Sequence, residues 1–230
     1  MAHLDRDGEV AVLHLGDDEN RFSPATVAEL RALVAEVAAD DGPGALVTTA
    51  SGKFWSNGLD LAWLADNGDQ LDDLLVAVHH LFADVLSLPV PTVAAIQGHA
   101  FAAGAMLAAC HDLAVMRADR GFWCVPEVDL GMEFTPGMDA LLAARMPHRT
   151  AHEAMVTGRR YGGHDAVAAG IVDAVADDAD AVLADAVARA RALAGKPRRS
   201  VALIKGRRHR DLLALLRDED ANTFGGGGLG

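Results

Sequence analysis

The chain has 230 residues, of which 51% are hydrophobic and 23% are charged, and its formal net charge is −13. This length suits one large domain or two small ones with a full apolar core, which excludes a disordered chain. The acidic balance argues against broad binding of nucleic acid or of an anionic membrane, because both require a positive potential.

The predicted elements of the first half alternate between strands and helices. A strand is predicted at 9–15. Ser23 and Pro24 then form a helix start, with serine as the N-cap and proline at the first helical position, and apolar residues follow at helical spacing. The next elements are a strand at 45–50, a loop at 51–60, a helix at 71–88, a strand at 92–96, a loop at 97–103 and a helix at 104–110.

Helices dominate the second half, which is typical of an α/β fold with a helical C-terminal region. Strands are predicted at 113–116, 122–125 and 171–175, and helices at 139–145, 148–157, 164–169, 177–193 and 198–220. The longest stretch without an acidic or basic residue, 85–111, contains Pro89 and Pro91. We therefore interpret it as strand, turn and helix and expect no membrane span.

Signatures of several other classes are missing. No G-x-G-x-x-G follows a strand, and there is no P-loop and no G-x-S-x-G, which argues against a dinucleotide-binding oxidoreductase. His148 and His152 lie four residues apart without an H-E-x-x-H motif, so a solvated helix face is favoured and no metal site is expected. Cys110 and Cys124 are expected to be free thiols in a reducing compartment.

Two segments rich in small residues, 54–61 and 98–106, follow predicted strands and lead into helices. Small residues let a backbone approach a ligand closely, and the first N–H groups of a helix lack internal partners. Two such loops facing each other can direct two N–H donors at one oxygen, which is an oxyanion hole. The alternative is two tight strand–helix turns that simply pack closely.

One carboxylate, Glu127, stands in the largely apolar segment 124–131. Burial raises the pKa of a carboxyl group, which suits a general base near neutral pH. The alternative is a surface glutamate on a loop. Asp129 and Glu133 lie nearby and would replace it only if a loop brought them in.

Several motifs, in this order and spacing, resemble the crotonase superfamily, that is, the enoyl-CoA hydratases and isomerases. They are most similar to the plant-type Δ3,Δ2-enoyl-CoA isomerases, and the resemblance covers nearly the whole chain. The segments that carry it are N-R-F-S at 20–23, G-L-D-L at 58–61, the loop at 98–106, H-D at 111–112, D-R-G-F at 119–122 and P-E at 126–127.

The resemblance implies a crotonase-like spiral of ββα units at 1–195 and a helical C-terminal segment of the same domain at 196–222, followed by a flexible tail at 223–230. Members of the superfamily commonly form trimers or pairs of trimers, so a homotrimer or hexamer is expected. A location in the cytoplasm is also expected, because the chain carries no peroxisomal Ser-Lys-Leu ending.

The resemblance also implies residue roles. The backbone N–H groups of Leu59 and Ala103 would bind the thioester oxygen, and Glu127 would be the catalytic base. Hydratases of the superfamily have a second glutamate, and its matching position here is Met106. Moving a double bond needs only one base, so the resemblance implies an isomerase that works through a dienolate.

Residues expected to contact the CoA or acyl part of the substrate are Arg21, Lys53, Ser56, Asn57, Gly58, Asp60, Gly104, Met106, Pro126 and Leu130. Further cations that suit the CoA phosphates are Lys205, Arg207 and Arg208, with ordinary solvated charges as the alternative. Aromatic candidates for an acyl tunnel, with core packing as the alternative, are Trp55, Trp63, Phe101, Phe122, Trp123 and Phe134.

The expected activity is therefore that of a Δ3,Δ2-enoyl-CoA isomerase acting on an acyl-CoA thioester. No cofactor is expected, since coenzyme A is part of the substrate. The alternatives are an enoyl-CoA hydratase, another crotonase such as an acyl-CoA thioesterase, and a non-catalytic acyl-CoA-binding protein. Replacement of Glu127 separates the enzymes from the binding protein, because only the enzymes depend on a base.

Overall fold

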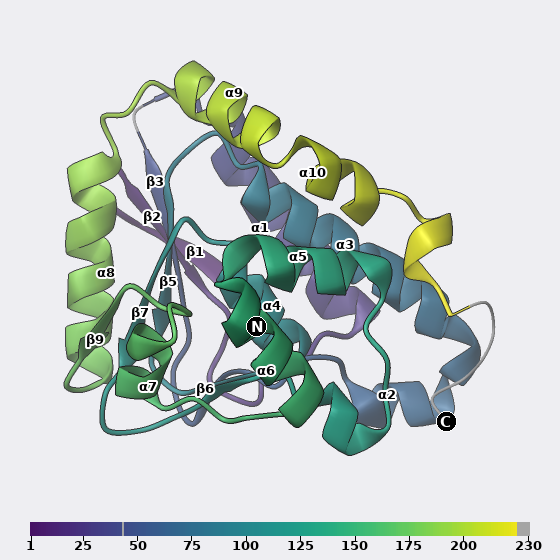
Figure 1. Ribbon diagram of the computed structural model, residues 1–230. Helices are drawn as coiled ribbons and strands as arrows, with labels where there is room; N and C mark the ends of the chain where they lie inside the picture. The colour runs from purple at the N-terminus through teal and green to yellow at the C-terminus, as the bar shows by residue number, and fades with distance from the viewer. Residues whose placement is uncertain (43, 225–230) are drawn as a thin grey trace.

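The computed structural model describes residues 1–42 and 44–224, and within them the larger sheet has six strands. The strand order is β1-β2-β3-β5-β7-β9, and only the β1–β2 pair is antiparallel (Figure 1). The strands are β1 (His3–Asp7), β2 (Val10–His14), β3 (Ala45–Thr49), β5 (Thr92–Ile96), β7 (Leu113–Arg117) and β9 (Ala174–Ala176).

Helices cover both faces of this sheet, which explains why β3 and β5 are buried along their whole length. The helix α8 (Ala179–Leu193) lies on one face, and α1 (Pro24–Ala39) and α3 (Leu71–Leu86) lie on the other (Figure 1). The predicted start of α1 is confirmed, because the Ser23 side chain accepts the N–H of Thr26.

A second sheet of three short parallel strands has the order β4-β6-β8. These strands are β4 (Phe54–Ser56), β6 (His99–Phe101) and β8 (Trp123–Cys124). Each follows a strand of the larger sheet and leads into a helical element, namely α2 (Leu61–Asp66), α4 (Ala103–Ala109) and the 3-10 helix η2 (Glu127–Leu130). This repeated unit agrees with the expected spiral of ββα units.

The predicted loops at 51–60 and 97–103 were wrong in part, because they contain β4 and β6. A strand of three residues is too short to produce an alternating pattern. The first strand, β1, was not predicted either; its burial is slight, and only Leu4 is partly covered. It is stabilised mainly by its ladder with β2.

The second half is mostly helical, as predicted. Its helices are α5 (Pro136–Arg145), α6 (His148–Thr157), α7 (Gly163–Ala168), α9 (Arg198–Arg208) and α10 (Arg210–Leu216), and short 3-10 turns occur at η1 (Gly68–Gln70) and η3 (Asp220–Asn222). The predicted single helix at 198–220 is interrupted at His209, so α9 and α10 are separate. The break allows α10 to bury three leucines while α9 buries Lys205.

The buried Lys205 side chain joins α9 to the larger sheet. Its Nζ lies 2.6 Å from Oδ2 of Asp112 and donates to the Val90 carbonyl at 2.9 Å. The same Oδ2 accepts from the N–H of Thr92 at 2.8 Å. Lys205 is therefore engaged inside the fold, away from the solvent in which a CoA phosphate would meet it.

The core histidine His111 also has hydrogen-bond partners on both ring nitrogens. In His111, Nδ1–H donates to the Leu107 carbonyl at 3.0 Å, so Nε2 accepts from the Thr48 hydroxyl at 2.8 Å. Burial lowers the pKa of His111 to about 4. The side chain of its neighbour Asp112 faces other partners, so the two residues form no catalytic dyad.

The C-terminal segment packs against the helices α3 and α5. The turn η3 and helix α10 lie against α3 and α5 (Figure 1). Thr223 and Phe224 belong to the described chain, whereas the remainder of the predicted flexible tail, 225–230, lies outside the described residues. No helix within the described ranges combines the length and apolarity needed to cross a bilayer.

Candidate active site

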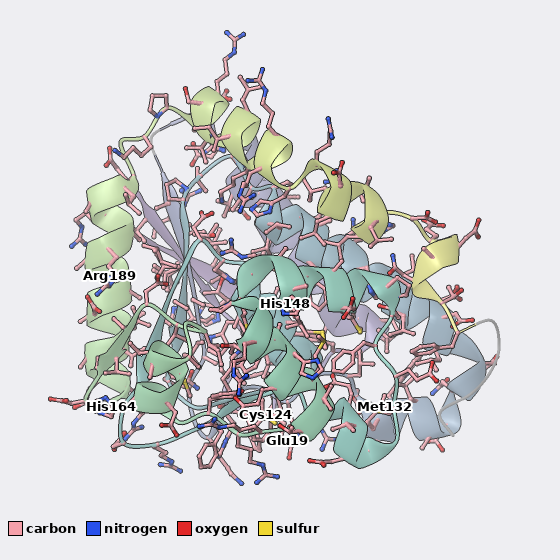
Figure 2. The ribbon with its side chains drawn as sticks, in the orientation of Figure 1. Glu19, Cys124, Met132, His148, His164 and Arg189 are labelled. Carbon is pink, nitrogen blue, oxygen red and sulfur yellow. The ribbon has the colours of Figure 1, made fainter. Side chains whose placement is uncertain are left out.

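The three strands of the small sheet bring the predicted site segments together. Ser56 of β4 pairs with Ala100 of β6, and Ala100 pairs with Trp123 of β8. Because parallel strands end at the same edge of a sheet, the segments that follow them are neighbours. Leu59 follows β4, Ala103 follows β6 and Glu127 follows β8. Cys124, labelled in Figure 2, marks the position of β8.

A cavity of about 330 Å³ opens at this edge. It is mostly apolar, with a few charged groups, which is the usual character of a small-molecule site. Its described lining residues are Arg21, Asn57, Leu59, Leu61, Leu71, Leu75, Phe101, Ala102, Ala103, Pro126, Glu127, Asp129, Leu130, Met132, Glu133, Met138, Arg160 and Phe224. Met132, labelled in Figure 2, lies between η2 and α5.

Seven of the residues predicted for the site lie in this lining: Arg21, Asn57, Leu59, Ala103, Pro126, Glu127 and Leu130. Six others do not belong to its described lining: Lys53, Ser56, Gly58, Asp60, Gly104 and Met106. Several of these six have clear structural partners, described next, and each role remains a prediction.

Ser56 and Gly104 pack one loop against the other. The Ser56 hydroxyl donates to the Asn20 carbonyl at 2.8 Å and accepts the N–H of Gly58. A Cβ on Gly104 would lie 2.7 Å from the side chain and carbonyl of Ser56, so only glycine fits there. Met106, two residues further along α4, is fully buried in the core.

Lys53 and Asp60 lie at the outside of the same region. The Lys53 ammonium lies 5.0 Å from the centre of the Phe54 ring. Asp60 caps α2 by accepting the N–H of Trp63 at 3.1 Å. The Arg21 guanidinium is paired with Glu19 and lies 3.7 Å from an Asp60 carboxylate oxygen. It therefore already has two carboxylate partners when no substrate is bound.

Leu59 and Ala103 each keep a backbone N–H without a partner among the described residues. Phe22 bonds to the Gly58 carbonyl and to the Asp60 N–H, which leaves the intervening N–H of Leu59 free. Ala103 is the first residue of α4, where no helical acceptor exists. The backbone just before it is strained, since Ala102 has φ +50° and ψ −128°.

Gly58 controls how closely these two loops approach. It has φ +78°, and a Cβ added to it would lie 2.8 Å from Cβ of Ala102 and 3.1 Å from the N atom of Ala103. The Leu59 and Ala103 loops are therefore in direct contact. This arrangement can present two N–H donors to one oxygen.

We expect Gly58→Ala to lower kcat about 100-fold, because the added methyl group pushes apart two loops whose positions must hold within about 1 Å. A loss of stability of about 1 to 2 kcal/mol should accompany it, from the positive φ. Steady-state kinetics and thermal unfolding measure the two effects. Gly206→Ala is the matched control, because a Cβ there meets nothing within 4 Å; a normal kcat in Gly58→Ala would contradict the expectation.

Glu127 is buried in the cavity wall, with 5% of its surface exposed. Its Oε2 is buried and makes no hydrogen bond within the described chain. Burial raises the pKa of Glu127 to about 7, slightly offset by its own backbone N–H. A carboxylate that has one oxygen free of hydrogen bonds and a pKa near neutral pH is well suited to accept and return a proton.

The pH dependence of kcat/KM should follow this group. A base must be ionised to act, so kcat/KM should rise with pH and level off above a midpoint near pH 7. Initial rates between pH 5.5 and 8.5 measure the midpoint. A profile that is flat across this range, as a glutamate with the ordinary pKa of 4.5 would give, would mean that Glu127 is solvated during the reaction.

Other lining residues carry the remaining charges and most of the apolar surface. Arg160, which sequence reasoning missed, lines the cavity and lies 5.8 Å from the Phe101 ring centre. Asp129 and Glu133 also reach the lining, and both are exposed. Arg160 lies in the irregular segment after α6, 33 positions after Glu127, and no motif or periodicity marks it.

The aromatic candidates divide between the cavity and the core. Phe101 lines the cavity. Trp55 and Trp123 are fully buried, and their ring N–H groups donate to backbone carbonyls, so the core-packing alternative describes them. Phe122 is 38% exposed, and Phe134 packs against the core.

Two further features lie beside the cavity or away from it. A second hollow of about 820 Å³ shares Arg21 but is otherwise rich in carboxylates, which suits phosphates poorly. On the β1–β2 hairpin, potential ligand atoms of His3, Asp5 and His14 lie within 4.8 Å of one another. None of the three lines the cavity.

Comparison with known proteins gives a consistent picture. A family described as enoyl-CoA hydratase/isomerase matches residues 5–221. The chain is 38% identical to enoyl-CoA delta isomerase 3 of Arabidopsis thaliana, over 85% of this chain and 86% of that protein. It is 39% identical to peroxisomal enoyl-CoA delta isomerase 2 of the same plant, over 78% and 79%.

Solved structures agree in fold. A structure described as the Mtb enoyl-CoA isomerase superposes with a TM-score of 0.86 at 30% identity, covering 95% of both chains. A structure from Mycobacterium tuberculosis described as a probable enoyl-CoA hydratase gives the same TM-score and identity, covering 94% of this chain and 91% of that one. The two structures are of one mycobacterial protein, which is described once as an isomerase and once as a hydratase.

Proposed function

This chain belongs to the enoyl-CoA hydratase/isomerase family, and we propose that it moves the double bond of a 3-enoyl-CoA thioester to the 2 position. The residue that does the chemistry in this proposal is Glu127. The observation that carries it is the buried Glu127 carboxyl, whose Oε2 has no hydrogen-bond partner in the described chain. It lines the same apolar cavity as Leu59 and Ala103, whose N–H groups have no partner among the described residues.

The reaction consists of two proton transfers. The Glu127 carboxylate removes a proton from C2, and the electron pair moves through the conjugated system onto the thioester oxygen, which gives a dienolate. The N–H groups of Leu59 and Ala103 stabilise that oxygen; one such donor is typically worth about 3 kcal/mol of barrier. Glu127 then returns the proton to C4, and the double bond lies between C2 and C3.

A carboxyl group with a raised pKa suits both transfers. With a pKa of about 7, Glu127 is a stronger base than an ordinary glutamate and still releases its proton readily. The buried, apolar surroundings keep water from the dienolate and strengthen the two hydrogen bonds to its oxygen. Met106, at the position of the second glutamate of hydratases, offers no titratable group.

The hydratase reaction is the second candidate, and one observation favours it. Asp129 and Glu133 line the same cavity as Glu127, so a second carboxylate is available to hold a water molecule. Both are exposed, however, whereas Glu127 is buried and its pKa is raised. This contrast supports a single-base reaction.

The proposal includes how the rest of the substrate is held. Arg21 and Arg160 would bind the anionic part of coenzyme A, since both are cations of the cavity lining. Lys53 is a further candidate nearby. No cofactor is involved, because coenzyme A is part of the substrate. A homotrimer or hexamer and a cytoplasmic location complete the proposal.

The test is to incubate the purified protein with a trans-3-enoyl-CoA and follow conjugation of the double bond with the thioester by ultraviolet absorbance. Hydration of a trans-2-enoyl-CoA and release of free CoA thiol are measured in parallel. We expect conjugation to be much faster than either other reaction. Faster hydration would favour the hydratase, thiol release a thioesterase, and binding without turnover a non-catalytic protein.

A further inference from the structure

The cavity has one strongly apolar wall, built from segments that are distant in sequence. Leu71 and Leu75 come from the first turns of α3, and Met138 comes from the first turn of α5. Phe224, which follows the last 3-10 turn, lines the same cavity and packs against the core. The C-terminal segment therefore supplies an aromatic ring to the site.

Two hydrogen bonds hold the segment that contains Phe224 against helices α3 and α5. The backbone N–H of Phe224 donates to the Asp72 carboxylate at 2.8 Å, which fixes it to the start of α3. Two residues earlier, the buried Asn222 accepts the N–H of Gly137 at 2.9 Å, which fixes the segment to the start of α5. The ring thus belongs to a firmly attached part of the chain.

Asn222 is also tied to its own segment. Its amide group donates to the carbonyls of Leu215 and Asp218 at 2.7 and 2.8 Å. All polar atoms of this buried side chain are therefore satisfied, which makes a single position of the segment strongly preferred.

The cations of the cavity and its apolar wall come from different segments. The cations Arg21 and Arg160 and the amide of Asn57 suit the CoA part of a substrate. The wall of Leu71, Leu75, Met138 and Phe224 offers no polar side-chain group, so it fits the hydrocarbon chain. An acyl chain bound at Glu127 and extending away from the cations would run along this wall.

We propose that Phe224 is a specificity-determining residue that limits the length of the acyl chain, so that short and medium chains are preferred. This inference rests on the proposed function, because it names the substrate class of the same site. The volume sets the scale: 330 Å³ holds roughly ten groups of about 30 Å³ each, and the thioester takes some of them. Chains of up to about eight carbons therefore fit.

The test measures kcat/KM of wild type, Phe224→Ala and Phe224→Trp. The 3-enoyl-CoA substrates have 6, 8, 10, 12 and 16 carbons, a range that extends to both sides of the roughly ten groups that fill the cavity. Removal of the ring should raise the ratio of kcat/KM for the 12-carbon over the 6-carbon substrate about tenfold, the usual size of discrimination in an apolar pocket. The larger tryptophan should lower the same ratio. The two substitutions thus act in opposite directions, which a general loss of stability would not produce.

Phe134→Ala is the matched control, because Phe134 packs against the core and is outside the described lining of the cavity. It should leave the ratio unchanged. Equal ratios in wild type, Phe224→Ala and Phe224→Trp would overturn the inference.

A binding measurement separates this inference from the proposed reaction. Calorimetric titration with saturated acyl-CoAs of the same lengths reports the chain-length limit without any turnover. If no variant isomerises but Phe224→Ala still tightens binding of the 12-carbon ester about tenfold, the length limit holds and the proposed reaction fails. If isomerisation is normal and neither binding nor kcat/KM depends on residue 224, the proposed reaction holds and the length limit fails.

Discussion

Replacement of Glu127 by glutamine is expected to lower kcat for isomerisation about 1000-fold while acyl-CoA binding is kept. Glutamine has the same size as glutamate, so the cavity wall is preserved, but an amide cannot accept the proton of C2. The loss of a positioned acid–base group typically costs between about 100- and 10,000-fold. Stopped assays of conjugation give kcat, and calorimetric titration with a saturated acyl-CoA gives the binding constant.

Glu133→Gln provides the matched control, because it is the same substitution in the same cavity lining. It should leave kcat for isomerisation within a few-fold of wild type. A Glu127→Gln protein that retains more than a tenth of the wild-type rate would rule out the single-base reaction. Equal losses in both variants would point to two cooperating carboxylates and would favour the hydratase candidate.

Glu127→Gln should also change how the free energy of unfolding depends on pH. The pKa of Glu127 is raised from 4.5 to about 7 in the folded protein, so between these values the folded state binds more protons than the unfolded state. Stability from this group is therefore present at low pH and is lost as pH rises through about 7. Glu127→Gln should remove that decline, which denaturant titrations at pH 5 and pH 8 would detect.

The largest loss of stability is expected from Asp112→Ala, at about 3 to 5 kcal/mol. This substitution leaves the buried Lys205 ammonium without its carboxylate, and an unpaired buried charge is strongly destabilising. Lys205→Met should cost less, because the Asp112 side chain is 33% exposed and keeps its bond to Thr92. Urea unfolding at neutral pH measures both free energies of unfolding.

The double variant gives the sharper result. Asp112→Ala combined with Lys205→Met should be more stable than Asp112→Ala alone, because the buried charge has been removed. Additive losses in the double variant would mean that the ion pair is not the cause. Asp211→Ala, which breaks the fully solvated pair with Arg210, is the control and should have no measurable effect.

Much of the fold follows from local sequence signals. Ser23 and Pro24 specify the start of α1, and β5 and α6 lie where the pattern places them. The short strands β4 and β6 were missed because their stability comes from neighbouring strands rather than from their own pattern. The break at His209 was also missed, since helical spacing continues through it.

The site residues also divide into those that a sequence motif marks and those that only tertiary packing brings to the cavity. The segments containing Leu59, Ala103 and Glu127 carry motifs, and the structure brings them to one cavity. Lys205 looked like a surface cation in the sequence, but long-range packing places it beside Asp112. Arg160 and Phe224 reach the cavity through turns whose geometry no local pattern encodes. Side chains that meet only through tertiary packing are therefore the ones that sequence reasoning misses.

The three short parallel strands have a consequence for how such a site can diverge. In the proposed reaction, β4, β6 and β8 each lead into one of the three groups involved: the N–H of Leu59, the N–H of Ala103 and the Glu127 carboxylate. The two proposed donors belong to the main chain, so replacing the side chains of Leu59 or Ala103 themselves does not remove the N–H groups. If these roles hold, evolution can keep the two N–H groups of the first two ββα units and change the acid–base residue in the third, which gives a different reaction on the same thioester.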